Sequence, residues 1–177
     1  EDYAIPSDRS FLFLDVGANI GFASVYFLSR NSANMVRCFE PDIANLGYLD
    51  RNLASFPGRT TVTDCAVAAQ TGEATFYRSE DGRNSGLSPN AVANIPVRVL
   101  TRRFDQVLAN AAESGIPLVV KLDVEGMEEE LVKSVKFENY PQLHRLFCES
   151  TTCSQLITRP HARTLRSGYV EDMHFTG

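Results

Sequence analysis

The chain has 177 residues, of which 44% are hydrophobic and 22% charged, and its formal net charge is −5 at pH 7. These values predict one globular domain over residues 1–177 with a substantial core, and they argue against a disordered chain. The acidic balance argues against a nucleic-acid partner, because phosphates need a clustered basic face. No apolar run is long enough for a membrane span.

Four cysteines occur, at positions 38, 65, 148 and 153, without the spacing that a zinc site needs. Cys38, Cys65 and Cys148 lie in or beside predicted strands, so we expect reduced, buried thiols, which favour a reducing compartment and a cytoplasmic protein. The chain begins at Glu1 rather than Met. This start leaves room for an upstream targeting or anchor segment, and for truncation at one or both ends.

The first predicted element is a buried strand over residues 11–14, followed by a glycine-spaced turn and a helix. Gly17 and Gly21 let the backbone turn tightly and let a ligand approach, while free amides at the start of the helix favour an anionic group such as a carboxylate. Asp15 stands at the mouth of this turn. Its charge would repel a pyrophosphate and attract an ammonium or sulfonium, which favours S-adenosylmethionine over NAD.

The rest of the chain alternates predicted strands with predicted helices. Strands are expected over residues 35–39, 60–64, 74–78, 96–100, 117–123 and 143–148, and helices over residues 43–53, 107–112 and 126–135. This alternation predicts an α/β fold of three layers, with a mainly parallel sheet covered by helices on both faces. The strands at 74–78 and 96–100 form a small hairpin insertion after the third strand, and their long polar connection is typical of a loop that binds a ligand or moves.

An acidic residue follows five of the predicted strands. These residues are Asp15, Glu40, Asp64, Asp123 and Glu149. Ligands of open α/β sheets bind outside the carboxyl ends of the strands, at the point where the strand order reverses. Solvated loops are acidic too, but five acids repeated at one edge of the sheet favour a binding site.

Glu40 lies 19 residues after Gly21, where a carboxylate can accept hydrogen bonds from both hydroxyls of a ribose. Pro41 then fixes the turn. We expect Asp64 to accept from the amino group of an adenine, and Asp15 to hold the ammonium of a methionine directly or through water. Glu40 would serve an NAD enzyme equally well, so it does not discriminate between the two cofactors.

A second acidic motif is the stretch Val-Val-Lys-Leu-Asp-Val-Glu-Gly over residues 119–126. Strand alternation places Lys121 and Asp123 on one face, and Glu125 follows with the same period. We expect Lys121 to form a structural ion pair with Asp123 or Asp15. Because this strand is expected beside the first one, Asp123 would lie near Asp15 and near a transferable methyl group.

Four motifs, read in order, resemble the FkbM-type S-adenosylmethionine-dependent methyltransferases. They are Asp-Val-Gly-Ala-Asn-Ile-Gly (15–21), Phe-Glu-Pro (39–41), Asp-Cys-Ala-Val (64–67) and Lys-Leu-Asp-Val-Glu-Gly (121–126). Asn19 stands where methyltransferases usually have glycine, and Asp64 where relatives often have Asn. The resemblance implies a Rossmann-like class I methyltransferase fold. The cofactor-binding residues that it implies are Asp15, Gly17, Asn19, Gly21, Glu40, Pro41, Asp64 and Cys65.

The resemblance also implies O-methylation of a hydroxyl on a sugar, a glycan or another small molecule. Asp123 or Glu125 would act as the base or orient this hydroxyl. We expect the acceptor to be covered by the loop that contains Tyr77, Arg83, Asn84 and Ser85. Near the end of the chain, a predicted helix over residues 159–166 and an extended segment over 169–175 would leave the closing antiparallel hairpin of such sheets incomplete.

Two alternatives stay open: an NAD-type Rossmann oxidoreductase and a non-catalytic S-adenosylmethionine-binding domain. A dehydrogenase would need a GxGxxG loop, which is absent from the sequence. A non-catalytic binder would not need Asp123 and Glu125. A metal site is not expected, although Asp123, Glu125 and Glu149 offer oxygen ligands that would suit Mg²⁺.

Overall fold

The computed structural model describes residues 8–80, 85–89 and 92–148, together with the backbone of residues 162–167 and 170–175. Its central sheet has seven strands in the order β3-β2-β1-β7-β8-β10-β9. Their bounds are β1 (Leu12–Val16), β2 (Met35–Phe39), β3 (Thr60–Thr63), β7 (Leu118–Leu122), β8 (Leu143–Cys148), β9 (Ala162–Ser167) and β10 (Val170–Phe175). Neighbours from β3 to β8 pair in parallel, whereas β10 is antiparallel to both β8 and β9.

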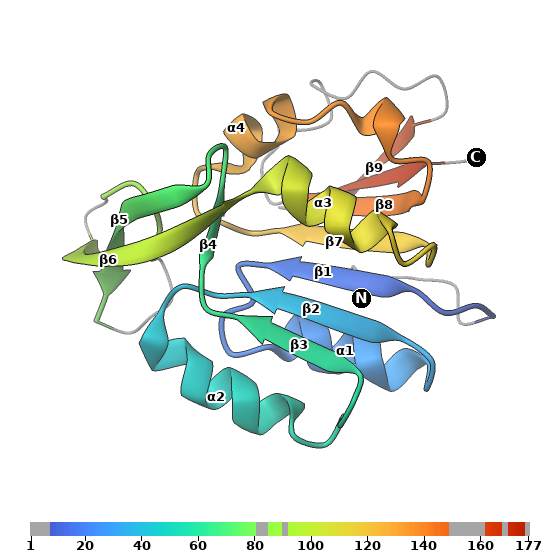
Figure 1. Cartoon of the computed structure of the whole chain (residues 1–177), viewed down its shortest axis with the longest axis horizontal. Helices are drawn as coiled ribbons and strands as arrows, with labels where there is room; N and C mark the ends of the chain where they lie inside the picture. The colour runs from blue at the N-terminus through green and yellow to red at the C-terminus, as the bar shows by residue number, and fades with distance from the viewer. Residues whose placement is uncertain (1–7, 81–84, 90–91, 149–161, 168–169, 176–177) are drawn as a thin grey trace.

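Helices cover both faces of this sheet (Figure 1). Helices α1 (Phe22–Arg30) and α2 (Ile43–Leu53) lie on one face, and α3 (Phe104–Ala112) and α4 (Glu128–Lys133) on the other. A short 3₁₀ helix, η1 (Phe137–Asn139), precedes β8. This arrangement confirms the predicted three-layer α/β fold with a mainly parallel sheet.

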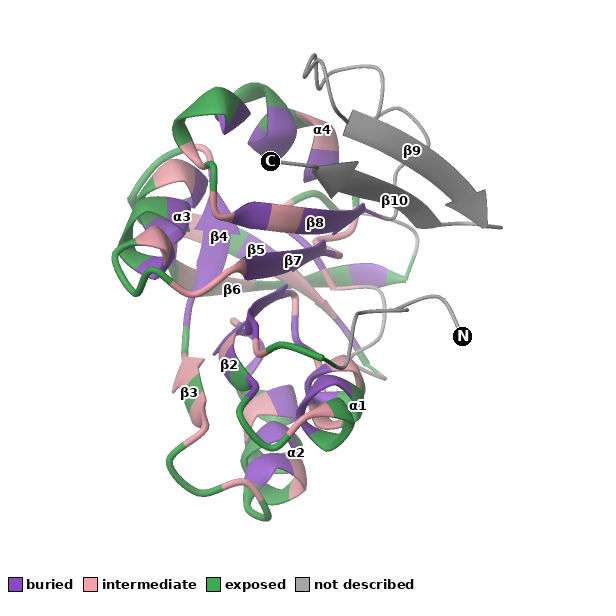
Figure 2. Cartoon of the chain, turned by 90° about the vertical axis from the view of Figure 1, so that its right-hand side faces the viewer, coloured by how far each residue is buried: buried purple, intermediate pink, exposed green. Residues whose placement is uncertain are grey.

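Strand β1 explains how the two faces are held together. Leu12 and Leu14 pack into the core with α3 and α4, whereas Phe13 packs into the core with α1 and α2. Successive side chains of a strand point to opposite faces, so a continuous apolar run is what a strand buried on both sides requires. Figure 2 shows β7 and β8 as buried central strands, while the helices carry exposed residues on their outer surfaces.

A second, smaller sheet follows β3 in the chain. It consists of β4 (Ala66–Ala68), β6 (Ala93–Arg103) and β5 (Gly72–Ser79), in that order. Strands β5 and β6 correspond to the two strands expected after the third one, and they pair antiparallel, while β4 pairs in parallel with β6. The three-residue strand β4 was not expected, because so short a segment shows no alternation of hydrophobic and polar residues that would predict a strand.

The prediction for the C-terminal segment is wrong. Residues 162–167 form strand β9 rather than part of a helix, and β9 pairs with β10, which in turn pairs with β8. The closing antiparallel hairpin is therefore present. Local helix propensity is a weak signal, and it is overridden here by non-local backbone pairing, which a single segment of sequence does not reveal.

The cysteine prediction is partly wrong. Cys38 and Cys65 are free and buried, as expected. Burial raises the pKa of the Cys38 thiol to about 12 and that of the Cys65 thiol to about 11. Cys148, however, is disulfide-bonded, and Cys153 lies outside the described residues. Disulfides persist in oxidising environments, so Cys148 does not support the expected reducing compartment.

No helix in the described part of the chain combines the length and the apolar character of a membrane-spanning segment.

Candidate functional site

The loop between β1 and α1 needs left-handed backbone at three positions. Gly17, Asn19 and Gly21 have φ values of +77°, +51° and +86°. A Cβ atom on Gly17 would lie 1.8 Å from the carbonyl oxygen of Asp123, so only glycine allows the end of β1 to approach the end of β7 this closely. Asn is among the few non-glycine residues that tolerate such a conformation, which explains its place in the loop.

Glu40 follows β2 and braces this loop. Its Oε2 accepts a hydrogen bond from the Asn19 backbone N–H (2.8 Å), and its Oε1 accepts from the Asp42 backbone N–H (2.8 Å) and from Asn45 Nδ2 (3.4 Å). Burial raises the pKa of Glu40, and these three hydrogen bonds oppose that rise. A carboxylate has about four acceptor positions, so Glu40 keeps capacity for a ligand.

Lys121 ties the ends of β1 and β7 together. Its Nζ lies 2.9 Å from Asp123 Oδ2, 3.3 Å from Asp15 Oδ1 and 2.9 Å from the Gly17 carbonyl oxygen. Asp15 is fully buried and also accepts a hydrogen bond from the Ser24 hydroxyl (2.6 Å). The expected ion pair of Lys121 is therefore present, and it involves both carboxylates.

Glu125 differs from Asp123 because no described side chain forms an ion pair or a hydrogen bond with its carboxylate, although the charge of Lys121 acts on it from a distance. The φ of Glu125, +52°, is unusual for a residue other than glycine. Its pKa is raised, first by partial burial and then by the charges of Asp123 and Glu128. The loop is held by Glu128, whose carboxylate accepts from the backbone N–H groups of Val124 (2.9 Å) and Gly126 (3.0 Å).

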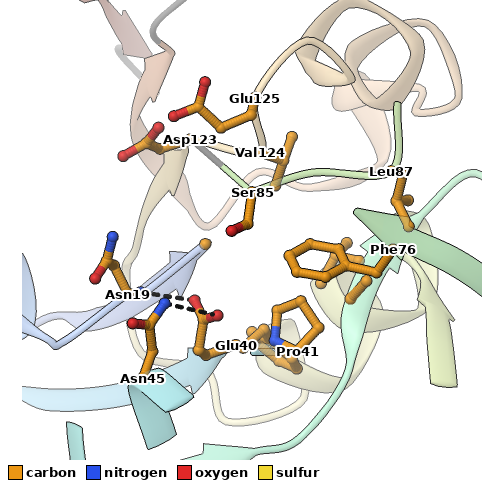
Figure 3. A pocket seen from close by; sticks show the side chains of 14 residues that line it. Asn19, Glu40, Pro41, Asn45, Phe76, Ser85, Leu87, Asp123, Val124 and Glu125 are labelled. Atoms are coloured by element: carbon orange, nitrogen blue, oxygen red, sulfur yellow. Dashed lines mark hydrogen bonds between the residues drawn. The ribbon is translucent and has the colours of Figure 1, made fainter. Parts of the chain in front are cut away.

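A cavity of about 70 Å³ lies at the ends of the central strands (Figure 3). Asp123, Val124 and Glu125 lie on one side of it, and Glu40 and Pro41 lie on the other. The second sheet and its neighbouring segments add a mainly apolar wall. That wall consists of Ala66, Val67, Phe76, Ser85 and Leu87. The cavity therefore combines three carboxylates with an apolar end.

The structure brings six of the predicted site residues to this cavity. They are Gly17, Asn19, Glu40, Pro41, Asp123 and Glu125. Asp15 and Gly21 lie behind it in the interior, and buried Cys65 does not line it either. Asp64 is exposed and lines a separate hollow next to Arg78. Of the loop expected to cover an acceptor, Ser85 lines the cavity, Tyr77 does not, and Arg83 and Asn84 lie outside the described residues.

Sequence reasoning missed the apolar wall and Glu128. Phe76 and Leu87 come from the second sheet and its connection, and no local pattern indicates that this sheet folds over the strand ends. The role of Glu128 could have been predicted from its position, since a glutamate in the first turn of a helix commonly accepts hydrogen bonds from free backbone amides. The part of the chain that the structure describes contains no cluster of three or more metal-ligating side chains, and Glu149 lies outside that part.

The family is decided by comparison with known proteins. Residues 15–150 match the model of the methyltransferase FkbM domain. This chain belongs to the FkbM methyltransferase family. S-adenosylmethionine is the methyl donor that this family implies, and the matched range contains every residue of the cavity. None of the curated proteins matches the chain.

Solved structures show the same fold at low sequence identity. The FkbM methyltransferase of Methylobacillus flagellatus KT has a TM-score of 0.62 and 15% identity, over 97% of this chain and 44% of that one. A putative caffeoyl-CoA O-methyltransferase from Staphylococcus aureus has a TM-score of 0.51 and 14% identity, over 96% of this chain and 76% of the other. An rRNA methylase from Streptococcus thermophilus also has a TM-score of 0.51. Its identity is 8%, over 94% of this chain and 87% of the other. This FkbM chain thus spans less than half the length of its Methylobacillus relative.

Proposed function

We propose that this protein transfers a methyl group from S-adenosylmethionine to a hydroxyl of a small molecule, sugar or glycan. The proposal rests mainly on the three carboxylates, Glu40, Asp123 and Glu125, that meet at one cavity beside the glycine loop. A cavity with this charge favours a ligand that carries a positive centre over a dinucleotide with its pyrophosphate. Neither an NAD enzyme nor a metal-dependent reaction has an observation of its own in its favour.

The chemistry of the lining fits the cofactor. S-adenosylmethionine, when bound, supplies an electrophilic methyl group on a positively charged sulfur. Glu40 would accept from one ribose hydroxyl with its remaining acceptor position, and the apolar wall around Phe76 would face the adenine. The backbone amides of Gly17, Ala18, Asn19 and Gly21 already donate within the protein, so the Ile20 N–H would be the loop's donor to the methionine carboxylate. Ligand sites usually enclose about 300 to 1,000 Å³, so the walls of this cavity must separate when a ligand of that size binds.

Glu125 is the better candidate for the base that removes the acceptor proton. Asp123 is held by Lys121 at 2.9 Å, which stabilises its charged form and limits its movement. Glu125 has no such partner among the described residues, and burial raises its pKa, which makes its carboxylate a stronger base. In this assignment Asp123 holds the acceptor or the positive centre in place, and Glu125 takes the proton.

The test is methyl transfer from a labelled donor to a panel of sugars and other hydroxyl compounds, with donor binding measured by calorimetry. Glu125→Gln should lower the rate by about 10²- to 10⁴-fold, the usual contribution of a general base, and leave donor binding nearly unchanged. The matched control is Glu130→Gln, because Glu130 is exposed on α4 and does not line the cavity. Transfer at the normal rate by Glu125→Gln would remove this assignment.

The donor itself needs a separate measurement. NAD and S-adenosylmethionine should be titrated in parallel, and only the latter should bind. Glu40→Gln should weaken that binding, because it removes the charge that attracts ribose hydroxyl donors. Binding without any detectable transfer to the panel would instead favour the non-catalytic alternative.

A further inference from the structure

A second hollow lies on the face of the sheet, away from the strand-end cavity. It measures about 770 Å³ and lies between strands β2 and β3 and helix α3. On this side no described helix crosses β2 and β3, whereas α1 lies on the opposite side (Figure 1). We call it the arginine groove. The residues that line it are Arg37, Phe39, Thr61, Thr63, Thr71, Arg102, Gln106, Val107 and Asn110.

The floor of the groove is fixed by the pairing of β2 with β3. Arg37 lies opposite Thr61, and Phe39 lies opposite Thr63. Residues two apart in a strand share a face, so these four side chains form one surface. Val36 and Cys38, which alternate with them, belong to the core under α1 and α2. The strand alternation therefore places Arg37 on the face of the sheet that carries α3, over β2 and β3, which no described helix crosses.

One wall of the groove is helix α3, and the other comes from β6 and the turn before β5. Arg37 Nη1 donates to the Asn110 carbonyl oxygen (3.2 Å), which draws the guanidinium toward α3. The Thr71 hydroxyl donates to Gln106 Oε1 (2.9 Å), and this bond links the two walls. Arg102, on β6, contributes the second positive charge.

The charge of the groove is opposite to that of the chain. The described lining contains two arginines and no carboxylate, although the net charge of the whole chain is −5. Neither Arg37 nor Arg102 forms an ion pair with a described carboxylate. Guanidinium groups match the planar fork of a carboxylate and the oxygens of a phosphate. Three threonine hydroxyls and two amides around them suit a ligand rich in hydroxyl groups.

We propose that the arginine groove binds an oxyanion, a carboxylate or a phosphate, carried by a sugar-like ligand. Arg37 and Arg102 bind the anion, and the threonine and amide side chains bind the hydroxyl groups of the attached body. The volume of the groove lies in the range of about 300 to 1,000 Å³ that is usual for small-molecule sites. This site is distinct from the strand-end cavity and does not depend on the proposed methyl transfer, although Phe39 lines both.

The test uses ¹⁵N-labelled protein titrated at low salt with inorganic phosphate, glucuronate and glucose. Phosphate, glucuronate or both should shift the amide signals of Thr61 and Asn110, and glucose should not. Tighter binding of phosphate points to a phosphate ester, and tighter binding of glucuronate points to an acidic sugar. Either result supports the oxyanion site.

Two arginine variants and one control localise the binding. Arg37→Ala and Arg102→Ala should each weaken it by about tenfold or more, because each removes hydrogen bonds to a charged group. Arg98→Ala should leave it unchanged, since Arg98 is exposed, pairs with Glu73 and does not line the groove. Arg102 makes no side-chain hydrogen bond with a described residue, so its variant also folds normally. Equal binding of glucose, or unchanged anion binding in Arg102→Ala, would overturn the proposal.

Discussion

The two hollows of this FkbM-family chain are formed by different parts of the same sheet. The strand-end cavity, the proposed cofactor site, lies at the ends of β1, β2 and β7, where loops with left-handed residues bring backbone and carboxylates together. The arginine groove lies on the face of β2 and β3, where regular strand alternation sets out its side chains. One hollow is acidic and small, and the other is basic and wide. The comparison teaches that loop geometry builds the first, whereas incomplete helical cover leaves the second.

This difference predicts that backbone changes damage the cavity most. Gly17→Ala should destabilise the protein by about 5 kcal/mol or more, or prevent folding, because the new methyl group would meet the Asp123 carbonyl oxygen at 1.8 Å. Gly58→Ala is the matched control, since Gly58 has a φ of +72° but open space around it. It should cost only about 1 to 2 kcal/mol, the cost of a left-handed non-glycine residue. Urea unfolding of both variants measures the difference, and equal losses would contradict it.

The next largest effect should come from the buried charges behind the cavity. Lys121→Met leaves Asp15 fully buried without its cation, which should cost about 3 to 5 kcal/mol. Lys133→Met, which removes an exposed pair with Glu129, should cost less than about 1 kcal/mol. Adding Asp15→Asn to Lys121→Met should restore part of the loss, as measured by thermal unfolding. A double variant less stable than Lys121→Met would show that Asp15 does not need the cation.

A smaller effect concerns the pH dependence of methyl transfer. The pKa of Glu125 is raised, mainly by burial, so its active, ionised form is lost at a higher pH than that of a free glutamate. Below that pKa the rate should fall by about tenfold per pH unit, because one proton inactivates the base. In Asp123→Asn this fall in rate should begin at lower pH, since the charge of Asp123 raises the pKa of Glu125. A pH–rate profile of both proteins tests this, and a fall that begins at the same pH in both would contradict the assignment of the base.

The same comparison explains which parts were predictable from sequence. Glu40 and Asp123 were found because each directly follows an apolar strand whose end faces the cavity. Asp15 also ends such a run, but it lies on the Phe13 side of β1, where it accepts from Ser24 in the interior. Asp64 lies where the chain leaves β3 for the second sheet, and its side chain is exposed.

The cavity's apolar wall and the arginine groove were beyond sequence reasoning for a common reason. Phe76 reaches the cavity only because the second sheet folds over the strand ends. Arg37 and Thr61 form one surface only because β2 pairs with β3, and that surface stays open because no described helix crosses these two strands there. Both features depend on contacts between segments distant in sequence, which no local period encodes. Most strands and helices have a local hydrophobic period and were predicted from it, whereas the short strand β4 was not predicted and strand β9 was predicted as a helix.

The smallest expected effect compares the two hollows directly, through salt. Arg102 is exposed, so its attraction for an anion should be screened as the Debye length falls from about 30 Å at 0.01 M salt to about 8 Å at 0.15 M. Phosphate binding in the groove should then weaken by about three- to fivefold over this range. Donor binding in the cavity should change by less than about twofold, because Glu40 is buried and buried charges are screened much less. The two titrations need the same buffer series. Equal salt sensitivity would mean that both ligands bind exposed charges, and the contrast between a buried cavity and an open groove would then be wrong.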